Sequence, residues 1–206
     1  MLNGRCVVVT GASGNLGAAV VARLKRDGAK VFGIDHATAD VTDEGQVEKA
    51  YDKAVAQNGP LWGAVHCTGG WSPGTVADTA VSTFEKMIAV NLRSTFLCSR
   101  AAVRRMSSGG RIVNVAALGP ATFTEIARSA AYAASKAGVI MLTRAIAEEG
   151  GPVRANCVAP GTMRTPQNAA ALPGADQSKW VPLEDVAEAI AYLLSPLAGN
   201  GAVITF

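Results

Sequence analysis

Hydrophobic and polar positions divide the chain into two kinds of segment. Short runs rich in valine and other apolar residues are typical of strands buried on both faces of a parallel sheet, and they cover residues 6–10, 30–34, 61–67, 110–117, 153–158 and 201–205. Between them, apolar residues recur at helical spacing in segments near 18–26, 43–56, 82–106, 131–146 and 182–194. This alternation predicts an α/β fold: a single doubly wound parallel sheet of about seven strands with helices on both faces.

Two segments depart from the simple alternation. Residues 82–106 read as one long helix that is apolar on more than one side, which favours association between subunits, so we expect a homodimer or homotetramer. Residues 167–180 show no periodicity, and we expect a mobile lid at about 166–181 over a site. One domain over residues 1–206 holds all of these elements.

Composition narrows the class of protein. Hydrophobic residues make up 49% of the chain and charged residues 17%, with a net charge of +3, so we expect a globular protein that binds neither nucleic acid nor a membrane. The apolar strand begins too close to the N-terminus for a signal peptide, which predicts a soluble, cytoplasmic chain. The four cysteines stand in apolar runs with no nearby histidine pair. We expect reduced thiols and no metal site.

The first strand leads into a glycine-rich turn and a helix. Gly11 allows a tight exit from the strand, and Gly17 lets the helix pack closely on it. Backbone N–H groups of the turn and of the helix N-terminus then face a pyrophosphate. The candidate contacts in this turn are Gly11, Ser13, Gly14, Asn15, Leu16 and Gly17. Asp35 ends the next strand, where it can hold the ribose hydroxyls of an adenosine, so the sequence predicts a dinucleotide-binding Rossmann unit.

Asp35 also bears on the choice of cofactor. A carboxylate repels a 2′-phosphate, and no Arg or Lys directly follows Asp35 or stands within the turn Gly11–Gly17. We therefore expect NAD(H) to be preferred over NADP(H). Asp40 and Val41 are placed for the edge of the adenine, although the two residues after them would also serve simply to cap the next helix.

A second glycine turn follows the third strand. Thr68, Gly69 and Gly70 stand at the carboxyl end of a parallel strand, where glycines let a ligand approach the backbone. The next residue, Trp71, either lines the site of a planar substrate or packs within its own loop.

The candidate chemistry lies at Tyr132 and Lys136. On a helix, these side chains leave the same face one turn apart. An ammonium beside a phenol lowers the pKa of that phenol towards neutrality, and the pair can then move a proton at a carbon that is reduced or oxidised. The spacing alone equally fits a solvated pair. Asn91 is a polar residue within the long predicted helix, so it either hydrogen-bonds locally or serves a site.

Taken together, these motifs make the chain similar to the short-chain dehydrogenase/reductase family over essentially its full length. They occur in the family's order: Thr10-Gly11, Gly14, Gly17, Asp35, Asp40-Val41, Gly69, Asn91, Tyr132 with Lys136, and Pro160-Gly161-Thr162 with Thr165. The resemblance implies an oxidoreductase that transfers hydride between a nicotinamide and a small-molecule substrate. It also implies the strand order 3-2-1-4-5-6-7.

The resemblance further implies roles for single residues. Tyr132 is the expected proton donor or acceptor, and Lys136 lowers the pKa of Tyr132 and holds the nicotinamide ribose. Asn91 maintains a water chain behind Lys136. The turn Pro160-Gly161-Thr162 orients the carboxamide, and Thr165 belongs to the same cofactor-binding stretch.

The chain also departs from the family pattern. Asn15 stands where the commonest turn has its second glycine, and the stretch 66–69 reads His-Cys-Thr-Gly instead of Asn-Asn-Ala-Gly. Most important, the expected catalytic serine falls on Ala117. That serine normally donates a hydrogen bond to the carbonyl oxygen being reduced, and losing such a donor costs on the order of 10²–10³ in rate. Either Thr122 or Thr124 replaces it, or the substrate does not need it.

The stretch 165–184 offers a reason for this loss. It is similar to the corresponding stretch of the quinonoid dihydropteridine reductase subgroup, which shares the Gly-Gly-Trp turn, prefers NADH and lacks the serine. This narrower resemblance implies NADH-dependent reduction of a conjugated ring. The alternatives are an alcohol or ketone dehydrogenase that uses a loop threonine, and a non-catalytic NAD-binding regulator.

Overall fold

The computed structural model describes residues 2–124 and 126–206. In this part of the chain, six strands form one parallel sheet in the order β2-β1-β3-β4-β5-β6. The strands are β1 Cys6–Thr10, β2 Lys30–Ile34, β3 Leu61–His66, β4 Gly110–Val115, β5 Val153–Ala159 and β6 Val203–Thr205. The α-helices are α1 Asn15–Arg26, α2 Glu44–Asn58, α3 Val81–Met87, α4 Ser94–Arg105, α5 Leu118–Thr122, α6 Ala130–Glu148, α7 Pro166–Ala171 and α8 Leu183–Leu193.

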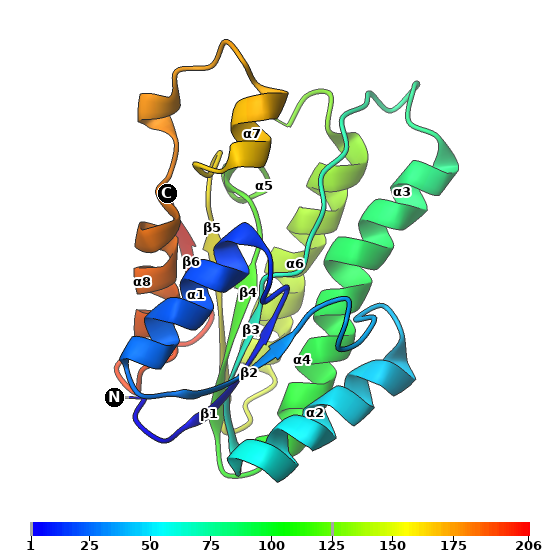
Figure 1. Ribbon diagram of the computed structural model, residues 1–206. Coiled ribbons are helices and arrows are strands. Elements are labelled where there is room, and N and C mark those ends of the chain that lie inside the picture. The colour runs from blue at the N-terminus through cyan, green and yellow to red at the C-terminus, as the bar shows by residue number, and fades with distance from the viewer. Residues whose placement is uncertain (1, 125) are drawn as a thin grey trace.

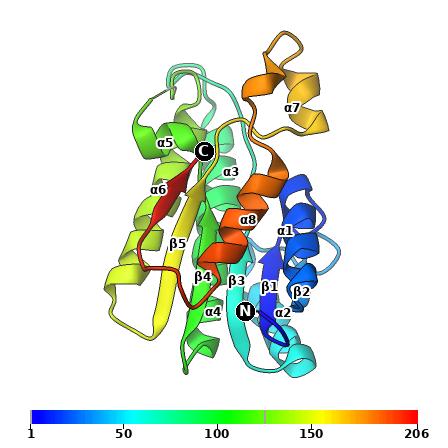
Figure 2. The same ribbon diagram turned by 90° about the vertical axis from the view of Figure 1, so that its left-hand side faces the viewer.

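Helices cover both faces of the sheet, as predicted (Figures 1 and 2). Successive side chains of a strand point to opposite faces. Val7 and Val9 of β1 therefore enter the core beneath α1 and α8. Cys6 and Val8 enter the core beneath α2 and α4. No helix of the described residues is long and apolar enough to cross a membrane.

The sheet has one strand fewer than the seven implied by the resemblance. The observed order equals the implied order without its outermost strand, so β2 lies at the edge. The segment between β2 and α2 folds into turns instead, because its carboxylates bond to nearby backbone. Asp35 accepts from the N–H groups of Ala37 and Thr38, and Asp40 accepts from that of Thr42.

The long helix predicted over residues 82–106 is interrupted. A six-residue π-helical segment, Ile88–Arg93, separates α3 from α4. The hydroxyls of Ser94 and Thr95 donate to the carbonyls of Val90 and Asn91 at 2.6 and 2.7 Å, which satisfies carbonyls in the widened turn. Such segments occur frequently at functional sites, and this one contains Asn91.

The predicted lid at about 166–181 contains α7 and a 3₁₀ turn, Gln177–Lys179, and the segment after β4 contains α5. The local cause of α7 is a capping arrangement in which the Thr165 hydroxyl accepts from the N–H of Asn168 and Pro166 occupies the first turn. Helices this short do not show a repeat of apolar positions in the sequence, so the sequence does not predict them.

Candidate active site

The glycine-rich turn between β1 and α1 is tightly folded. Gly11 has φ of +65°, a conformation that favours glycine, and its carbonyl accepts from the N–H of Gly14 at 2.9 Å. A Cβ added at Gly17 would lie 2.0 Å from the carbonyl oxygen of Gly11. The prediction that Gly17 permits close packing of the helix is therefore confirmed.

Beside this turn lies a cavity of about 240 Å³ at the carboxyl end of the strands. It brings together seven of the predicted cofactor residues: Gly11, Ser13, Gly14, Asp35, Val41, Thr68 and Gly69. It also takes in four residues that the sequence reasoning did not assign to the cofactor: Ile34, His36, Ala39 and Cys67. The apolar residues Ala39 and Val41, two positions apart, are the sequence feature that could have indicated one side of this cavity.

The cavity has the chemistry that an adenosine requires. Ile34, Ala39 and Val41 give it an apolar wall, and the Asp35 carboxylate stands at its rim. The hydrogen bond from the Thr38 hydroxyl, with those from nearby N–H groups, lowers the pKa of Asp35, so this group is an anion at neutral pH. Gly11 and Gly69 have no side chain to occupy the cavity, and Gly69 is exposed. These residues fit the adenosine end of a dinucleotide.

Other predicted cofactor residues do not line this cavity. The Asp40 carboxylate is bonded to the N–H and hydroxyl of Thr42 at 2.8 and 2.7 Å, and Asp43 caps α2 through the N–H of Gln46. Asn15, Leu16 and Gly17 lie in the first turn of α1, and Gly70 follows the lining residues along the chain.

The turn after β5 has its own contacts. The carbonyl of Pro160 accepts from the N–H of Leu118 at 3.0 Å, and the carbonyl of Thr162 accepts from the N–H of Val181 at 2.9 Å. These bonds hold Pro160, Gly161 and Thr162 at the carboxyl end of β5, while Thr165 caps α7. The turn therefore stands at the same edge of the sheet as the cavity.

Lys136 and Asn91 meet the second glycine turn from two different helices. The Lys136 ammonium donates to the carbonyl of Val115 at 2.7 Å. A Cβ at Gly69 would lie 3.2 Å from Nζ of Lys136 and 2.9 Å from Oδ1 of Asn91. Only a glycine leaves this approach open.

Asn91 makes three well-formed hydrogen bonds from the π-helical segment. Its Oδ1 accepts from the N–H of Gly70 at 2.8 Å, and its Nδ2 donates to the carbonyl of Gly70 at 3.0 Å. Nδ2 also donates to the hydroxyl of Ser135 at 2.9 Å, and that hydroxyl donates to the carbonyl of Tyr132 at 2.7 Å. Ser135 thus links Asn91 to the helix of Tyr132 and Lys136, a role that its position between them did not reveal.

The pKa values of the pair differ from the sequence expectation. Burial raises the pKa of Tyr132 to about 12 and lowers that of Lys136 to about 8. The expected lowering of the Tyr132 pKa by Lys136 is wrong for the protein alone, because desolvation dominates and the ammonium is bonded to the Val115 carbonyl. At neutral pH the phenol carries its proton and Lys136 is largely charged.

The position of the missing serine is a buried alanine. Ala117 lies between the end of β4 and the start of α5 and is 7% exposed. The hydroxyls of Thr122 and Thr124 are 2.7 Å apart, and that of Thr122 also donates to the carbonyl of Leu118 at 3.0 Å. In the described part of the chain, neither hydroxyl bonds to Tyr132. Both are engaged within their own loop.

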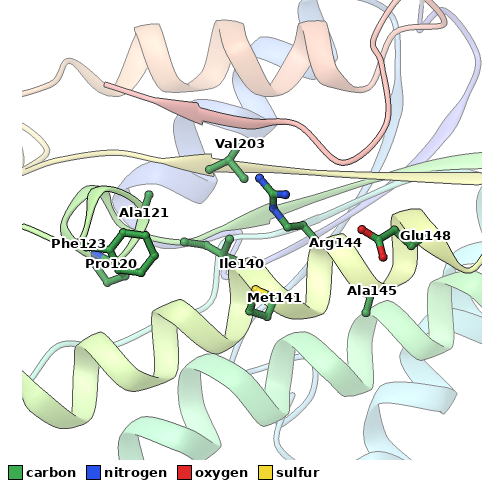
Figure 3. A pocket seen from close by; sticks show the side chains of 9 residues that line it. All are labelled: Pro120, Ala121, Phe123, Ile140, Met141, Arg144, Ala145, Glu148 and Val203. Carbon is green, nitrogen blue, oxygen red and sulfur yellow. The ribbon is translucent and has the colours of Figure 1, made fainter.

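A larger cavity lies elsewhere, between α5, α6 and the edge strand β6 (Figure 3). It measures about 440 Å³ and is lined by Pro120, Ala121, Phe123, Ile140, Met141, Arg144, Ala145, Glu148 and Val203. Neither Tyr132 nor Lys136 is among these residues. Neither residue lines the smaller cavity either, but the ammonium of Lys136 approaches Gly69, which does line it. The two glycine turns and Asp35 therefore assign the site to the smaller cavity, although size alone would favour the larger.

Comparison with known proteins agrees with this arrangement. Residues 2–204 match the family model described as Enoyl-(Acyl carrier protein) reductase. A short-chain type dehydrogenase/reductase of Picea abies is 33% identical over 237 residues, covering 94% of this chain and 87% of the relative. A cis-4-hydroxycyclohexanecarboxylate dehydrogenase of Sinomonas cyclohexanicum is 35% identical, covering 94% of this chain and 90% of the relative.

A solved structure shows the same architecture. The blue fluorescent protein from a metagenomic library, in complex with NADPH, superposes with a TM-score of 0.86 at 27% identity, covering 99% of this chain and 96% of that protein. The motifs, the sheet and these matches agree. The chain belongs to the short-chain dehydrogenase/reductase family and is an oxidoreductase of that type, a class that binds a nicotinamide cofactor.

Proposed function

We propose that the protein is an NADH-dependent reductase of a conjugated ring, similar in reaction to a quinonoid dihydropteridine reductase. The proposal rests on which groups are present, and which one is missing, at the carboxyl edge of the sheet. The groups that hold and move a proton are present, Tyr132 with Lys136 and Asn91, whereas the neighbouring position that would donate to a carbonyl oxygen is Ala117.

The cofactor is proposed to lie along the carboxyl ends of the strands. The cavity at Asp35 would hold the adenosine, and the turn Gly11–Gly17 would hold the pyrophosphate at the start of α1. Lys136 would reach the nicotinamide ribose past Gly69. When bound, the nicotinamide supplies or accepts the hydride. The edge residues Asp40, Gly70, Pro160, Gly161, Thr162 and Thr165 are assigned to the same cofactor on their position alone.

The preference for NADH rests on the Asp35 carboxylate, which hydrogen bonds keep ionised at the cavity rim. A 2′-phosphate placed there would meet a like charge. We expect Asp35→Ala to raise the ratio of kcat/KM for NADPH to that for NADH roughly tenfold, the effect of about 1.4 kcal/mol. Steady-state kinetics with both cofactors measures this ratio. An unchanged ratio would contradict the assignment, and Asp176→Ala, an exposed acid near α7, is the matched control.

The proton step follows from the buried phenol. With a pKa of about 12, Tyr132 starts as a proton donor, which suits the direction of reduction. Lys136 holds positive charge nearby, and Asn91 with Ser135 fixes the helix that carries both groups. A conjugated ring that is already polarised accepts hydride without a second hydrogen-bond donor at its oxygen. The absence of a hydroxyl at Ala117 therefore slows reduction of such a ring little.

The exposed Trp71 is consistent with the proposal of a planar substrate. Its indole is 60% exposed directly after Gly70, the residue that Asn91 holds. Two backbone bonds tie this loop to the start of α6, between Gly74 and residues Arg128 and Ala130, at 2.8 and 3.3 Å. The loop that carries Trp71 is thus tied to the N-terminal end of the helix that contains Tyr132.

An NADH-oxidation panel tests the substrate class. A quinonoid dihydropterin, a quinone and simple ketones are compared with wild type and with a Thr122→Val, Thr124→Val double variant. The proposal expects wild type to turn over the ring substrates and the double variant to do so at a near wild-type rate. Turnover of ketones alone, with collapse in the double variant, would establish the alternative, a ketone or alcohol dehydrogenase that uses a loop threonine.

One relative supports the alternative function of a ketone or alcohol dehydrogenase, because the Sinomonas protein is named as a dehydrogenase of a cyclic alcohol. A third candidate, a non-catalytic NAD-binding regulator, predicts NADH binding with no turnover of any substrate. Comparing wild type with Tyr132→Phe separates these cases: full activity of Tyr132→Phe on every substrate found would contradict the assigned proton donor.

The protein is further proposed to act as a homodimer or homotetramer. Phe84 and Phe96, on α3 and α4, are each 45% exposed, and Met141 on α6 is 64% exposed. Apolar side chains of this size on neighbouring helices favour burial against a second copy. Light scattering of the purified protein measures the mass, and a monomer at micromolar concentration would contradict the proposal.

A further inference from the structure

One hydrogen bond joins the start of α1 to α7 across the carboxyl edge of the sheet. The side-chain amide of Asn15 donates from Nδ2 to Oε1 of Gln167 at 2.6 Å, although the two residues are 152 positions apart. Asn15 is the first residue of α1 and Gln167 the second of α7. Figures 1 and 2 both show α7 above the upper end of α1.

The segment that carries Gln167 is anchored at its two ends. The N–H of Arg164 donates to the carbonyl of Val181, and the N–H of Val181 donates to the carbonyl of Thr162, each at 2.9 Å. Trp180 is buried beside this junction. Residues 165–179 therefore form a flap hinged where Thr162 and Arg164 meet Val181.

Between these anchors the flap has little hold on the rest of the molecule. Neither α7 nor the 3₁₀ turn Gln177–Lys179 contains a buried residue. The remaining side-chain hydrogen bonds of the flap, made by Thr165, Asn168, Asp176 and Ser178, stay within residues 163–178. Of the described side-chain hydrogen bonds, the Asn15–Gln167 pair is the one that fastens the flap to the first strand and helix.

The helical turn that carries Gln167 is held in place by its neighbours. Thr165 caps α7, and Nδ2 of Asn168 donates to the carbonyl of Met163 at 2.7 Å, which fixes the first turn of the helix. Asn15 belongs to the turn in which the family's commonest pattern has glycine. The side chain that replaces glycine is thus the group that reaches the flap.

We propose that the Asn15–Gln167 pair is a latch that holds the flap over the pyrophosphate-binding turn and thereby slows release of the dinucleotide. This inference rests on the proposed function, because it takes the turn Gly11–Gly17 as the pyrophosphate site. A cofactor lying on that turn leaves past Asn15, so the flap has to detach before the cofactor departs. Asn15 and Gln167 act as positioning residues.

Stopped-flow displacement of NADH tests the latch. Bound NADH is displaced by excess NAD⁺, and the fall of its fluorescence gives the dissociation rate for wild type, Asn15→Ala, Gln167→Ala and the double variant. We expect Gln167→Ala to raise this rate about three- to tenfold, the factor that corresponds to one neutral hydrogen bond. The double variant should be no faster than Asn15→Ala alone, because both changes remove one bond.

The matched control is Gln177→Ala, which removes the same kind of side chain from an exposed position on the flap. An unchanged rate in Gln167→Ala, an equal rise in Gln177→Ala, or additive effects in the double variant would overturn the latch and leave the proposed function intact. Absence of NADH binding by wild type would overturn the proposed function, and the cofactor role of the latch with it.

Limited trypsin digestion without cofactor gives a second readout that does not depend on activity. Lys179, whose side chain is 83% exposed, lies at the end of the flap. Cleavage there requires local opening. We expect faster cleavage at Lys179 in Gln167→Ala than in wild type and Gln177→Ala. Equal cleavage in all three proteins would show that the pair does not hold the flap.

Discussion

Ala117 is the residue on which the proposed substrate class rests. Restoring a hydroxyl there would place a donor at the end of β4, where the family's serine normally contacts a carbonyl oxygen. We expect Ala117→Ser to raise kcat/KM for simple ketones by about tenfold or more, and to change turnover of a dihydropterin less than twofold, because only the first class gains from the donor.

Parallel assays with NADH and the two substrate classes measure this difference. Ala116→Ser is the matched control, since Ala116 precedes Ala117 and is also buried. An equal gain for both classes, or a gain in the control, would count against the proposed role of this position.

The proposed role of Lys136 predicts that cofactor binding is sensitive to pH. Burial lowers its pKa to about 8, so the ammonium that is proposed to hold the ribose loses its proton as the pH rises through that value. We expect kcat/KM for NADH, which reports the free enzyme, to be level between pH 6 and about 7.5 and to fall above about pH 8. Lys136→Arg should move this fall above pH 10, and a profile level to pH 10 in wild type would contradict the role of Lys136.

The elements of the site differ in how far the sequence determines them. The positions of the observed strands and of the glycine turn were predicted correctly, because apolar runs and glycine spacing are local signals, although β2 and β6 are only partly buried. The π-helical segment at Asn91 was not, since it depends on hydroxyls of Ser94 and Thr95 that also fit an ordinary helix. The pKa of Tyr132 was also mispredicted, because burial depends on tertiary packing that residue spacing does not show.

The π-helical segment should be essential to the site as an element. Asn91→Leu keeps the shape of the side chain but leaves the N–H and carbonyl of Gly70, and the hydroxyl of Ser135, without their partner. We expect a loss of about 1–3 kcal/mol in the free energy of unfolding and weaker NADH binding. Urea denaturation and NADH fluorescence measure the two effects.

Ser94→Ala is the comparison for that experiment, because it removes one local hydrogen bond in the same segment. It should cost less stability and leave NADH affinity near the wild-type value. Equal losses in the two variants would show that Asn91 has no special part in joining the helices to the glycine turn.

At the scale of the whole molecule, a buried polar chain crosses the core from α2 to α6. The Tyr51 hydroxyl is 2.9 Å from Nε2 of His66, and Nδ1 of His66 is 2.7 Å from Oδ1 of Asn114. Nδ2 of Asn114 donates to Thr143, and the Thr143 hydroxyl donates to the carbonyl of Val139. Because Oδ1 of Asn114 only accepts, Nδ1 of His66 carries the proton and Nε2 accepts from Tyr51.

This series of buried hydrogen bonds predicts that the fold loses stability at acid pH. Burial lowers the pKa of His66 from 6.5 to about 4, so the unfolded state binds more protons between these values. Stability is then fully present above pH 6.5 and is lost as the pH falls towards 4, by about 3 kcal/mol in total. Chemical denaturation at several pH values should show a smaller loss for His66→Asn than for wild type, and parallel curves would contradict this account.

The strand order also has a consequence for the order in which the protein is made. Every residue that lines the adenosine-sized cavity lies between Gly11 and Gly69. The strands β1, β2 and β3 that support it are neighbours in the sheet, so every residue that lines the proposed nucleotide pocket is synthesised before Tyr132. Each later strand then joins the growing outer edge in turn. The proposed ligand pocket and the proposed reactive group thus lie in successive parts of the chain, the pocket first.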